Sequence, residues 1–129
     1  MQTRHYSKKR EAILHALRST DTHPTAEWVY RTLKDEYPDL SLATVYRNLK
    51  LFKESGDAVS VCTVNGQERF DGNVDEHSHF VCAICHAVID LDAVAPVDVL
   101  SKPGFLIDRV DLLAHGTCHN CLQGNALKQ

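Results

Sequence analysis

Four of the five cysteines form two Cys-x-x-Cys pairs, Cys82 with Cys85 and Cys118 with Cys121. Each pair places two thiols close enough to bind one ion. Together the pairs supply four sulfur ligands, the tetrahedral set that Zn²⁺ prefers in structural sites. A redox-active dithiol is the alternative for a single pair, but two pairs separated by a spacer favour zinc. We therefore expect these four residues to bind a structural zinc ion.

A second group of side chains with metal-binding capacity carries nitrogen and oxygen rather than sulfur. Asp71, His77 and His79 precede the first cysteine pair, and Asp90 follows it. On a strand, His77 and His79 would point to the same face, because side chains alternate along a strand. Three or four such ligands suit a second metal, but histidines near acidic residues are also typical of a polar surface. From the residues alone, both interpretations stay open.

The composition bounds the class of protein. At 129 residues and 43% hydrophobic content, the chain fits one globular domain or two small ones. It contains no apolar run of about 18 residues, the length typical of a membrane-spanning helix. The polar, basic N-terminal residues lack the apolar segment of a secretory signal. Cysteines in metal-type spacing, without an export signal, predict a protein of the reducing cytoplasm with no membrane partner.

The first 70 residues predict a winged helix-turn-helix domain. Apolar residues recur at helical spacing in three short segments, and the second and third begin at the capping residues Thr25 and Ser41. Gly56 ends the third helix. Asn65-Gly66 between two strand-like runs is a strong hairpin signal. The expected helices and strands span residues 8–18, 25 to about 36, 41–54, 58–64 and 67–70.

The third helix is the candidate DNA-reading element. It carries Thr44, Tyr46, Arg47, Asn48 and Lys50, with Lys53 further along, away from its expected apolar stripe. Such side chains can contact phosphates and base edges in a major groove. The net charge of −3 gives no bulk attraction to DNA, although residues 1–60 hold 10 basic and 8 acidic side chains. A merely solvated helix face is the alternative interpretation.

The remaining residues predict a second, smaller α+β domain. Residues 71–74 form a polar, glycine-containing hinge, so the expected domains span 1–70 and 75–129. Strand patterns cover 80–84, 87–91 and 105–113, and a short helix is expected near 96–102. The domain has few apolar residues, so zinc binding or dimerisation must supply part of its stability.

Taken together, these motifs resemble the ferric uptake regulator superfamily, and the resemblance covers nearly the whole chain from about residue 8. Within the superfamily the peroxide-stress regulators are most similar, because that branch is associated with aspartate at the positions of Asp71 and Asp90. The matching segments are His23-Pro-Thr-Ala26, Ser41-Leu-Ala-Thr-Val-Tyr-Arg-Asn-Leu49, Arg69-Phe-Asp71, His77-x-His79-x-x-Cys82-x-x-Cys85, Asp90 and Cys118-x-x-Cys121.

The resemblance implies a regulatory metal site made of His23, Asp71, His77, His79 and Asp90, holding Fe²⁺ or Mn²⁺. It implies a homodimer that represses transcription at a palindromic operator in double-stranded DNA, and no enzymatic role. Metal bound by ligands from both domains would set the spacing of the two recognition helices. In the peroxide branch, Fe²⁺ and hydrogen peroxide oxidise a coordinating histidine, here His23 or His77, and DNA is released.

Three other functions remain open at this point. An iron- or manganese-responsive regulator of the same fold would not use oxidation. A zinc enzyme would need an open zinc position and a nearby acid or base, which a four-cysteine site does not leave. A zinc-stabilised interaction module would bind a protein rather than DNA, and its binding would lack the steep salt dependence of phosphate contacts.

Overall fold

The computed structural model describes residues 8–75, 77–92 and 102–124. The chain divides into two compact units, the N-terminal unit Met1–Val74 and the C-terminal unit Asp75–Gln129. Helices dominate the first and strands the second, which confirms the expected α+β class. Among the described residues, no helix is both long and apolar enough to cross a membrane.

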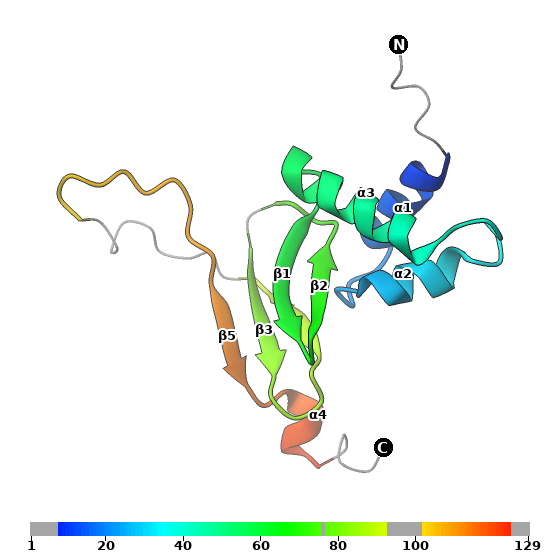
Figure 1. Cartoon of the computed structure of the whole chain (residues 1–129). Helices are drawn as coiled ribbons and strands as arrows, with labels where there is room; N and C mark the ends of the chain where they lie inside the picture. The colour runs from blue at the N-terminus through cyan, green and yellow to red at the C-terminus, as the bar shows by residue number, and fades with distance from the viewer. Residues whose placement is uncertain (1–7, 76, 93–101, 125–129) are drawn as a thin grey trace. The chain divides into compact units, whose positions relative to one another are not determined.

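From residue 8 onward, where the structure describes it, the N-terminal unit consists of three helices followed by a hairpin (Figure 1). The two strands pair antiparallel. This is the winged helix-turn-helix arrangement that the sequence predicted. Its elements are α1 (Lys8–Arg18), α2 (Ala26–Leu33), α3 (Leu42–Ser55), β1 (Val59–Val64) and β2 (Gln67–Asp71).

Local capping signals begin and end these helices. The Thr25 hydroxyl accepts a hydrogen bond from the Trp28 amide at 3.1 Å, and the Ser41 hydroxyl accepts one from the Thr44 amide at 3.1 Å. Each bond satisfies one of the amides that a helix leaves without a partner at its N-terminus. Gly56 ends α3 with a φ of 84°, a left-handed conformation that glycine adopts without steric cost.

The hairpin turn follows from its two central residues. Asn65 and Gly66 both have positive φ, 53° and 77°, as a two-residue turn of type I′ requires. The strand pairing is regular from this turn to Cys62 opposite Arg69. A bulge then shifts the register between Ser60 and Cys62.

The helices and the hairpin share one hydrophobic core. Side chains from all three helices and from β2 are nearly inaccessible to solvent, so the N-terminal unit has the packed interior of an independently folding domain. The most buried of these side chains are Ile13, Leu17, Val29, Val45, Leu49 and Phe70, and Leu40 joins them from the loop before α3.

Gly72 packs directly against the end of α1. A Cβ atom at this position would lie 2.9 Å from the backbone nitrogen of Arg18 and 2.9 Å from the carbonyl carbon of Leu17. Because backbone atoms cannot rotate away, we expect Gly72→Ala to lower the free energy of unfolding of this unit by about 1–3 kcal/mol. Urea unfolding measures the effect against the neighbouring Asn73→Ala, and equal midpoints for the two variants would contradict the prediction.

In its described residues, the C-terminal unit forms a three-stranded sheet followed by one helical turn. The strand order is β4-β3-β5, with β4 antiparallel and β5 parallel to the central β3. Figure 1 shows β5 running in the same direction as β3. The elements are β3 (Ser78–Cys82), β4 (Val88–Leu91), β5 (Leu113–Gly116) and α4 (His119–Leu122).

The strand predicted over 105–113 was wrong in its position. β5 begins at Leu113 and ends at Gly116, while residues 105–112 have no regular structure. The alternation in 105–113 is a local pattern, whereas the strand is defined by pairing with β3, in which Gly116 lies opposite Cys82. The expected strand at 80–84 also ends earlier, at Cys82. The helix predicted at 96–102 lies outside the described residues except for Lys102.

Candidate metal centres

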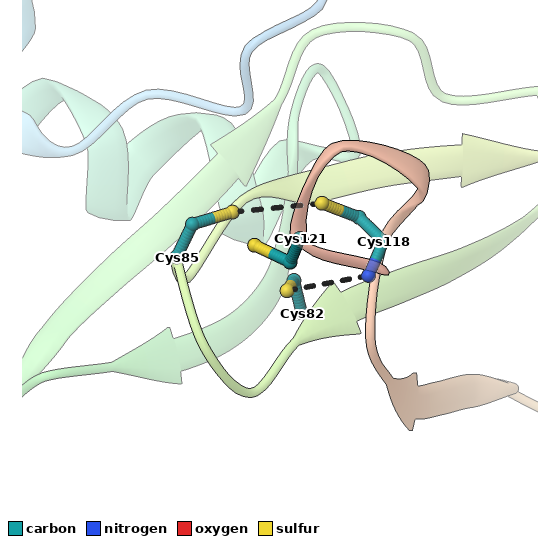
Figure 2. A group of neighbouring side chains, drawn as sticks. All are labelled: Cys82, Cys85, Cys118 and Cys121. Carbon is teal, nitrogen blue, oxygen red and sulfur yellow. Dashed lines mark hydrogen bonds between the residues drawn. The ribbon is translucent and has the colours of Figure 1, made fainter. Parts of the chain in front are cut away.

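The four cysteines of the two pairs meet at one end of the C-terminal sheet. Cys82 is the last residue of β3 and Cys85 lies in the turn that follows, while Cys118 and Cys121 lie at the start of α4 and within it. Figure 2 shows their sulfur atoms directed toward one another. The four Sγ atoms all lie within 4.8 Å of each other. Because β5 pairs parallel to β3, the cysteine pair that follows β5 lies beside the cysteine pair at the end of β3.

The geometry of this thiol cluster fits a tetrahedral zinc ion. Zinc–sulfur bonds of about 2.3 Å at tetrahedral angles place neighbouring sulfur atoms about 3.8 Å apart. The Cys85 and Cys118 sulfurs lie 3.8 Å apart. All four corners are sulfur, so no coordination position remains open for a substrate.

Backbone amides prepare one of these sulfurs to carry negative charge. The amides of Ile84 and Cys118 each donate to the Cys82 sulfur at 3.4 Å. Donation by the amides of Cys85, Cys118 and Ile84 lowers the pKa of Cys82 to about 6, against the opposing effect of burial. Burial, together with the neighbouring cysteines, raises the pKa of Cys121 to about 12. A divalent cation would compensate the charge that the four sulfurs cannot carry together.

A second, oxygen- and nitrogen-based cluster of the same unit consists of His77, directly before β3, His79 on β3 and Asp90 on β4. His79 pairs directly with Asp90 across the two strands. The Asp90 Oδ1 atom lies 3.0 Å from His77 Nε2 and 3.3 Å from His79 Nε2. The two imidazole rings are 4.4 Å apart between centroids, on the same face, as the His-x-His spacing predicted.

The hydrogen bonding of His77 orients its second nitrogen toward the cluster. His77 Nδ1 lies 2.5 Å from the backbone carbonyl oxygen of Asp75, which can only accept, so Nδ1 carries the proton. In the neutral ring, Nε2 then presents a lone pair to the Asp90 carboxylate. Two such acceptors at 3.0 Å repel each other unless a proton or a metal ion lies between them. This arrangement is typical of a metal-ligating histidine whose other nitrogen is fixed by a carbonyl.

The N-terminal unit carries the other two expected ligands, His23 and Asp71. His23 Nε2 lies 3.2 Å from Asp71 Oδ2, and both side chains are buried. His23 lies in the loop before α2, and Asp71 is the last residue of β2. Hairpin and loop thus bring a nitrogen and an oxygen donor together within one unit. Carboxylates and imidazoles suit Fe²⁺ and Mn²⁺, in contrast to the soft sulfurs of the thiol cluster.

The expected DNA-reading side chains all lie on α3, but they do not share one environment. Tyr46, Arg47 and Lys50 are exposed, and Thr44 is half-buried. Arg47 Nη2 donates to Thr44 Oγ1 at 3.1 Å, which draws the guanidinium toward the N-terminus of the helix. The face of α3 that carries these side chains is accessible to a ligand from solvent.

Asn48 differs from these residues because its side chain is buried. Its amide nitrogen donates to the Thr44 carbonyl at 2.9 Å, and its Oδ1 accepts from Arg10 Nε at 2.9 Å. The sequence pattern predicts Asn48 away from the apolar stripe of α3, among the DNA-reading side chains, and does not indicate a role for Arg10. The Asn48 side-chain amide can be buried because Arg10 of α1 donates a hydrogen bond to it. The residue pattern of α3 alone does not indicate this partner.

Comparisons with known proteins agree with this architecture. The model of the ferric uptake regulator family matches residues 2–101. The peroxide operon regulator of Bacillus subtilis (strain 168) is 34% identical over 118 residues, covering 88% of this chain and 81% of the relative. The peroxide-responsive repressor PerR of Staphylococcus aureus (strain USA300) is 39% identical over 82 residues, 64% of this chain, and the match spans 55% of the relative's length.

Solved structures show the same fold. A crystal structure of the Campylobacter jejuni peroxide stress regulator matches with a TM-score of 0.76 and 32% sequence identity, covering 88% of each chain.

Proposed function

The chain belongs to the ferric uptake regulator family, and on that premise we propose that it is a metal-dependent transcriptional repressor that senses hydrogen peroxide. The observation that carries this proposal is the cluster of His77, His79 and Asp90, in which the Asp90 Oδ1 atom lies 3.0 Å from His77 Nε2 and 3.3 Å from His79 Nε2. The similarity to two regulators that are named for peroxide supports hydrogen peroxide as the signal.

We assign the two metal centres different roles. The thiol cluster of Cys82, Cys85, Cys118 and Cys121 holds a structural Zn²⁺ ion, because its sulfurs fill a tetrahedron. A closed site of this kind stabilises the unit and is not the sensor. It also gives no position for substrate, so we propose no enzymatic activity.

The regulatory metal, Fe²⁺ or Mn²⁺, takes its ligands from both units. His23 and Asp71 belong to the N-terminal unit, and His77, His79 and Asp90 belong to the C-terminal unit. When both sets of donors hold one ion, the hinge between them loses its freedom. Metal binding then favours the one orientation that is competent for DNA and shifts the population toward it.

DNA binding is assigned to α3 of the winged helix. Thr44, Tyr46, Arg47 and Lys50 face the major groove, where their contacts position the helix and read bases. Asn48, which lies beneath this face, instead holds Arg10 at the junction of α1 and α3. The operator is palindromic double-stranded DNA, and we place the repressor in the cytoplasm with it.

A homodimer matches this operator symmetry. The C-terminal unit exposes large apolar side chains ahead of β5, with Phe105 66% and Leu106 87% accessible. Exposed apolar groups of this size are typical of a surface that another protein covers. We therefore assign dimerisation to this unit.

Oxidation of a ligand histidine is the mechanism that the resemblance to the peroxide-stress regulators implies. Held by these residues, Fe²⁺ would supply the redox chemistry that activates hydrogen peroxide, and the histidine ring would supply the two electrons that reduce the peroxide to water. A ring carbon of His23 or His77 exchanges its hydrogen for hydroxyl, so that C–H and H₂O₂ give C–OH and water. Because the oxidised ring is a poor ligand, the metal no longer joins the two units. The DNA is then released.

Operator binding under anaerobic conditions tests this function. We expect Fe²⁺ and Mn²⁺ each to promote binding, and a small dose of peroxide to abolish binding in the Fe²⁺ sample while leaving the Mn²⁺ sample bound. Protein without regulatory metal but with zinc is the control. Binding that survives peroxide in both samples would instead indicate a plain iron- or manganese-responsive repressor.

A further inference from the structure

Three consecutive residues of β2, Arg69, Phe70 and Asp71, contact the loop before α2. The guanidinium of Arg69 donates to two backbone carbonyls, to that of Thr22 at 2.8 Å and to that of His23. The amide of Phe70 donates to the Pro24 carbonyl at 3.0 Å. The Asp71 carboxylate lies 3.2 Å from the His23 ring.

The backbone of His23 requires such support. Its φ is 55°, in the left-handed region that non-glycine residues rarely adopt. The following proline makes this conformation still less favourable, because a residue before proline is restricted to extended backbone. His23 is nevertheless 1% exposed, with its ring directed at Asp71. Contacts from outside the loop must therefore hold this conformation.

The planar fork of an arginine is suited to this task. Two N–H groups of one guanidinium reach the carbonyls of the two peptide groups that flank the His23 Cα atom, which fixes the orientation of both peptides. Arg69 and Asp71 point to the same face of β2, while Phe70 between them is buried in the core. The core position of Phe70 thus anchors both side chains that act on His23.

We propose that Arg69 is a positioning residue for the regulatory metal, holding His23 in the strained conformation in which its ring can act as a ligand. This role rests on the proposed function in taking His23 as a ligand. Arg69 acts in this role through the backbone carbonyls of Thr22 and His23. Its action is to prepare the N-terminal half of the site before any ion binds.

A double-mutant cycle tests this role by Mn²⁺ affinity of the zinc-loaded protein. Changing a group behind a metal ligand costs about 10- to 100-fold in affinity, and we expect Arg69→Gln to fall in this range. In a His23→Ala background, Arg69→Gln should weaken Mn²⁺ binding by less than about 2-fold, since two changes that act through one contact are not additive. Arg31→Gln, which alters an exposed arginine of the same unit, should bind like the wild type.

A measurement on protein without regulatory metal tests whether Arg69 orders the loop around His23, independently of Mn²⁺ affinity. Hydrogen exchange in the zinc-loaded, Mn²⁺-free protein should be faster at residues 22–26 and at the Phe70 amide in Arg69→Gln than in Arg31→Gln. Arg69→Lys keeps the charge but loses the fork, so it should show an intermediate Mn²⁺ affinity. This variant also replaces Arg69→Gln if the latter does not fold.

Three results would overturn the role of Arg69. If hydrogen exchange at residues 22–26 is equally fast in Arg69→Gln and Arg31→Gln, Arg69 does not position His23. An equal loss of Mn²⁺ affinity with and without His23 shows that Arg69 acts elsewhere. Wild-type Mn²⁺ affinity in His23→Ala shows that His23 is not a ligand, which contradicts the proposed regulatory site itself and identifies that as the point of failure.

Discussion

Cys121→Ser is expected to lose the zinc ion and to unfold the C-terminal unit while the N-terminal unit stays folded. Cys121 is buried among the other three cysteines. The buried apolar residues described in this unit are Val81, Cys82, Val88 and Cys121, so half of them belong to the thiol cluster. Structural zinc contributes about 10–16 kcal/mol of apparent binding free energy at neutral pH, more than the unit can replace by packing.

Metal analysis and hydrogen exchange of the two units measure this effect. The hydrophobic core formed by the three helices and β2 lies in the N-terminal unit, so amide protection should persist in α1 to α3. Cys62→Ser is the matched control, because Cys62 is a half-buried thiol on β1 outside the cluster. A Cys121→Ser protein with one zinc per chain and normal protection in β3 would contradict the structural role of the thiol cluster.

His77→Ala is expected to abolish metal-dependent operator binding while zinc content and dimerisation remain normal. The substitution removes the imidazole whose Nε2 lies 3.0 Å from Asp90. Loss of a direct ligand should weaken Mn²⁺ binding by more than the roughly 10- to 100-fold that a change behind a ligand costs. Asp90→Ala should behave in the same way, because its carboxylate lies against both His77 and His79.

Operator binding at increasing Mn²⁺ concentration, with sedimentation to follow the dimer, provides the measurement. His115→Ala is the matched control, since His115 is an exposed histidine on β5 of the same unit. It should bind the operator like the wild type. Metal-dependent binding retained in both His77→Ala and Asp90→Ala would sink the assignment of the regulatory site.

The parts of the fold that the sequence predicted are those with local signals. Thr25 and Ser41 cap their helices through bonds to residues three positions later, and Asn65-Gly66 closes the hairpin on its own. The meeting of the four cysteines was also predictable, because a shared metal ion requires it. Each of these inferences needs only a short segment or the spacing of one residue type.

The parts that could not be predicted depend on distant partners. The position of β5 is set by pairing with β3, in which Gly116 lies opposite Cys82. Asn48 is buried because Arg10 of another helix supplies a donor. His23 adopts a positive φ that a residue before proline disfavours, held by Arg69 of β2. The periodicity of one element contains no information about such contacts.

The central claim is that a regulatory metal directs peroxide to a ligand histidine, and peptide mass spectrometry tests it most directly. Trypsin releases residues 19–31, which contain His23 as their one histidine, and residues 70–109, in which fragment ions separate His77 from His79 and His86. After peroxide treatment of the Fe²⁺-loaded protein, one added oxygen is predicted on His23 or His77, and none in the Mn²⁺-loaded protein. Release of the operator by peroxide with both histidines unmodified, or equal oxidation with either metal, would contradict the account.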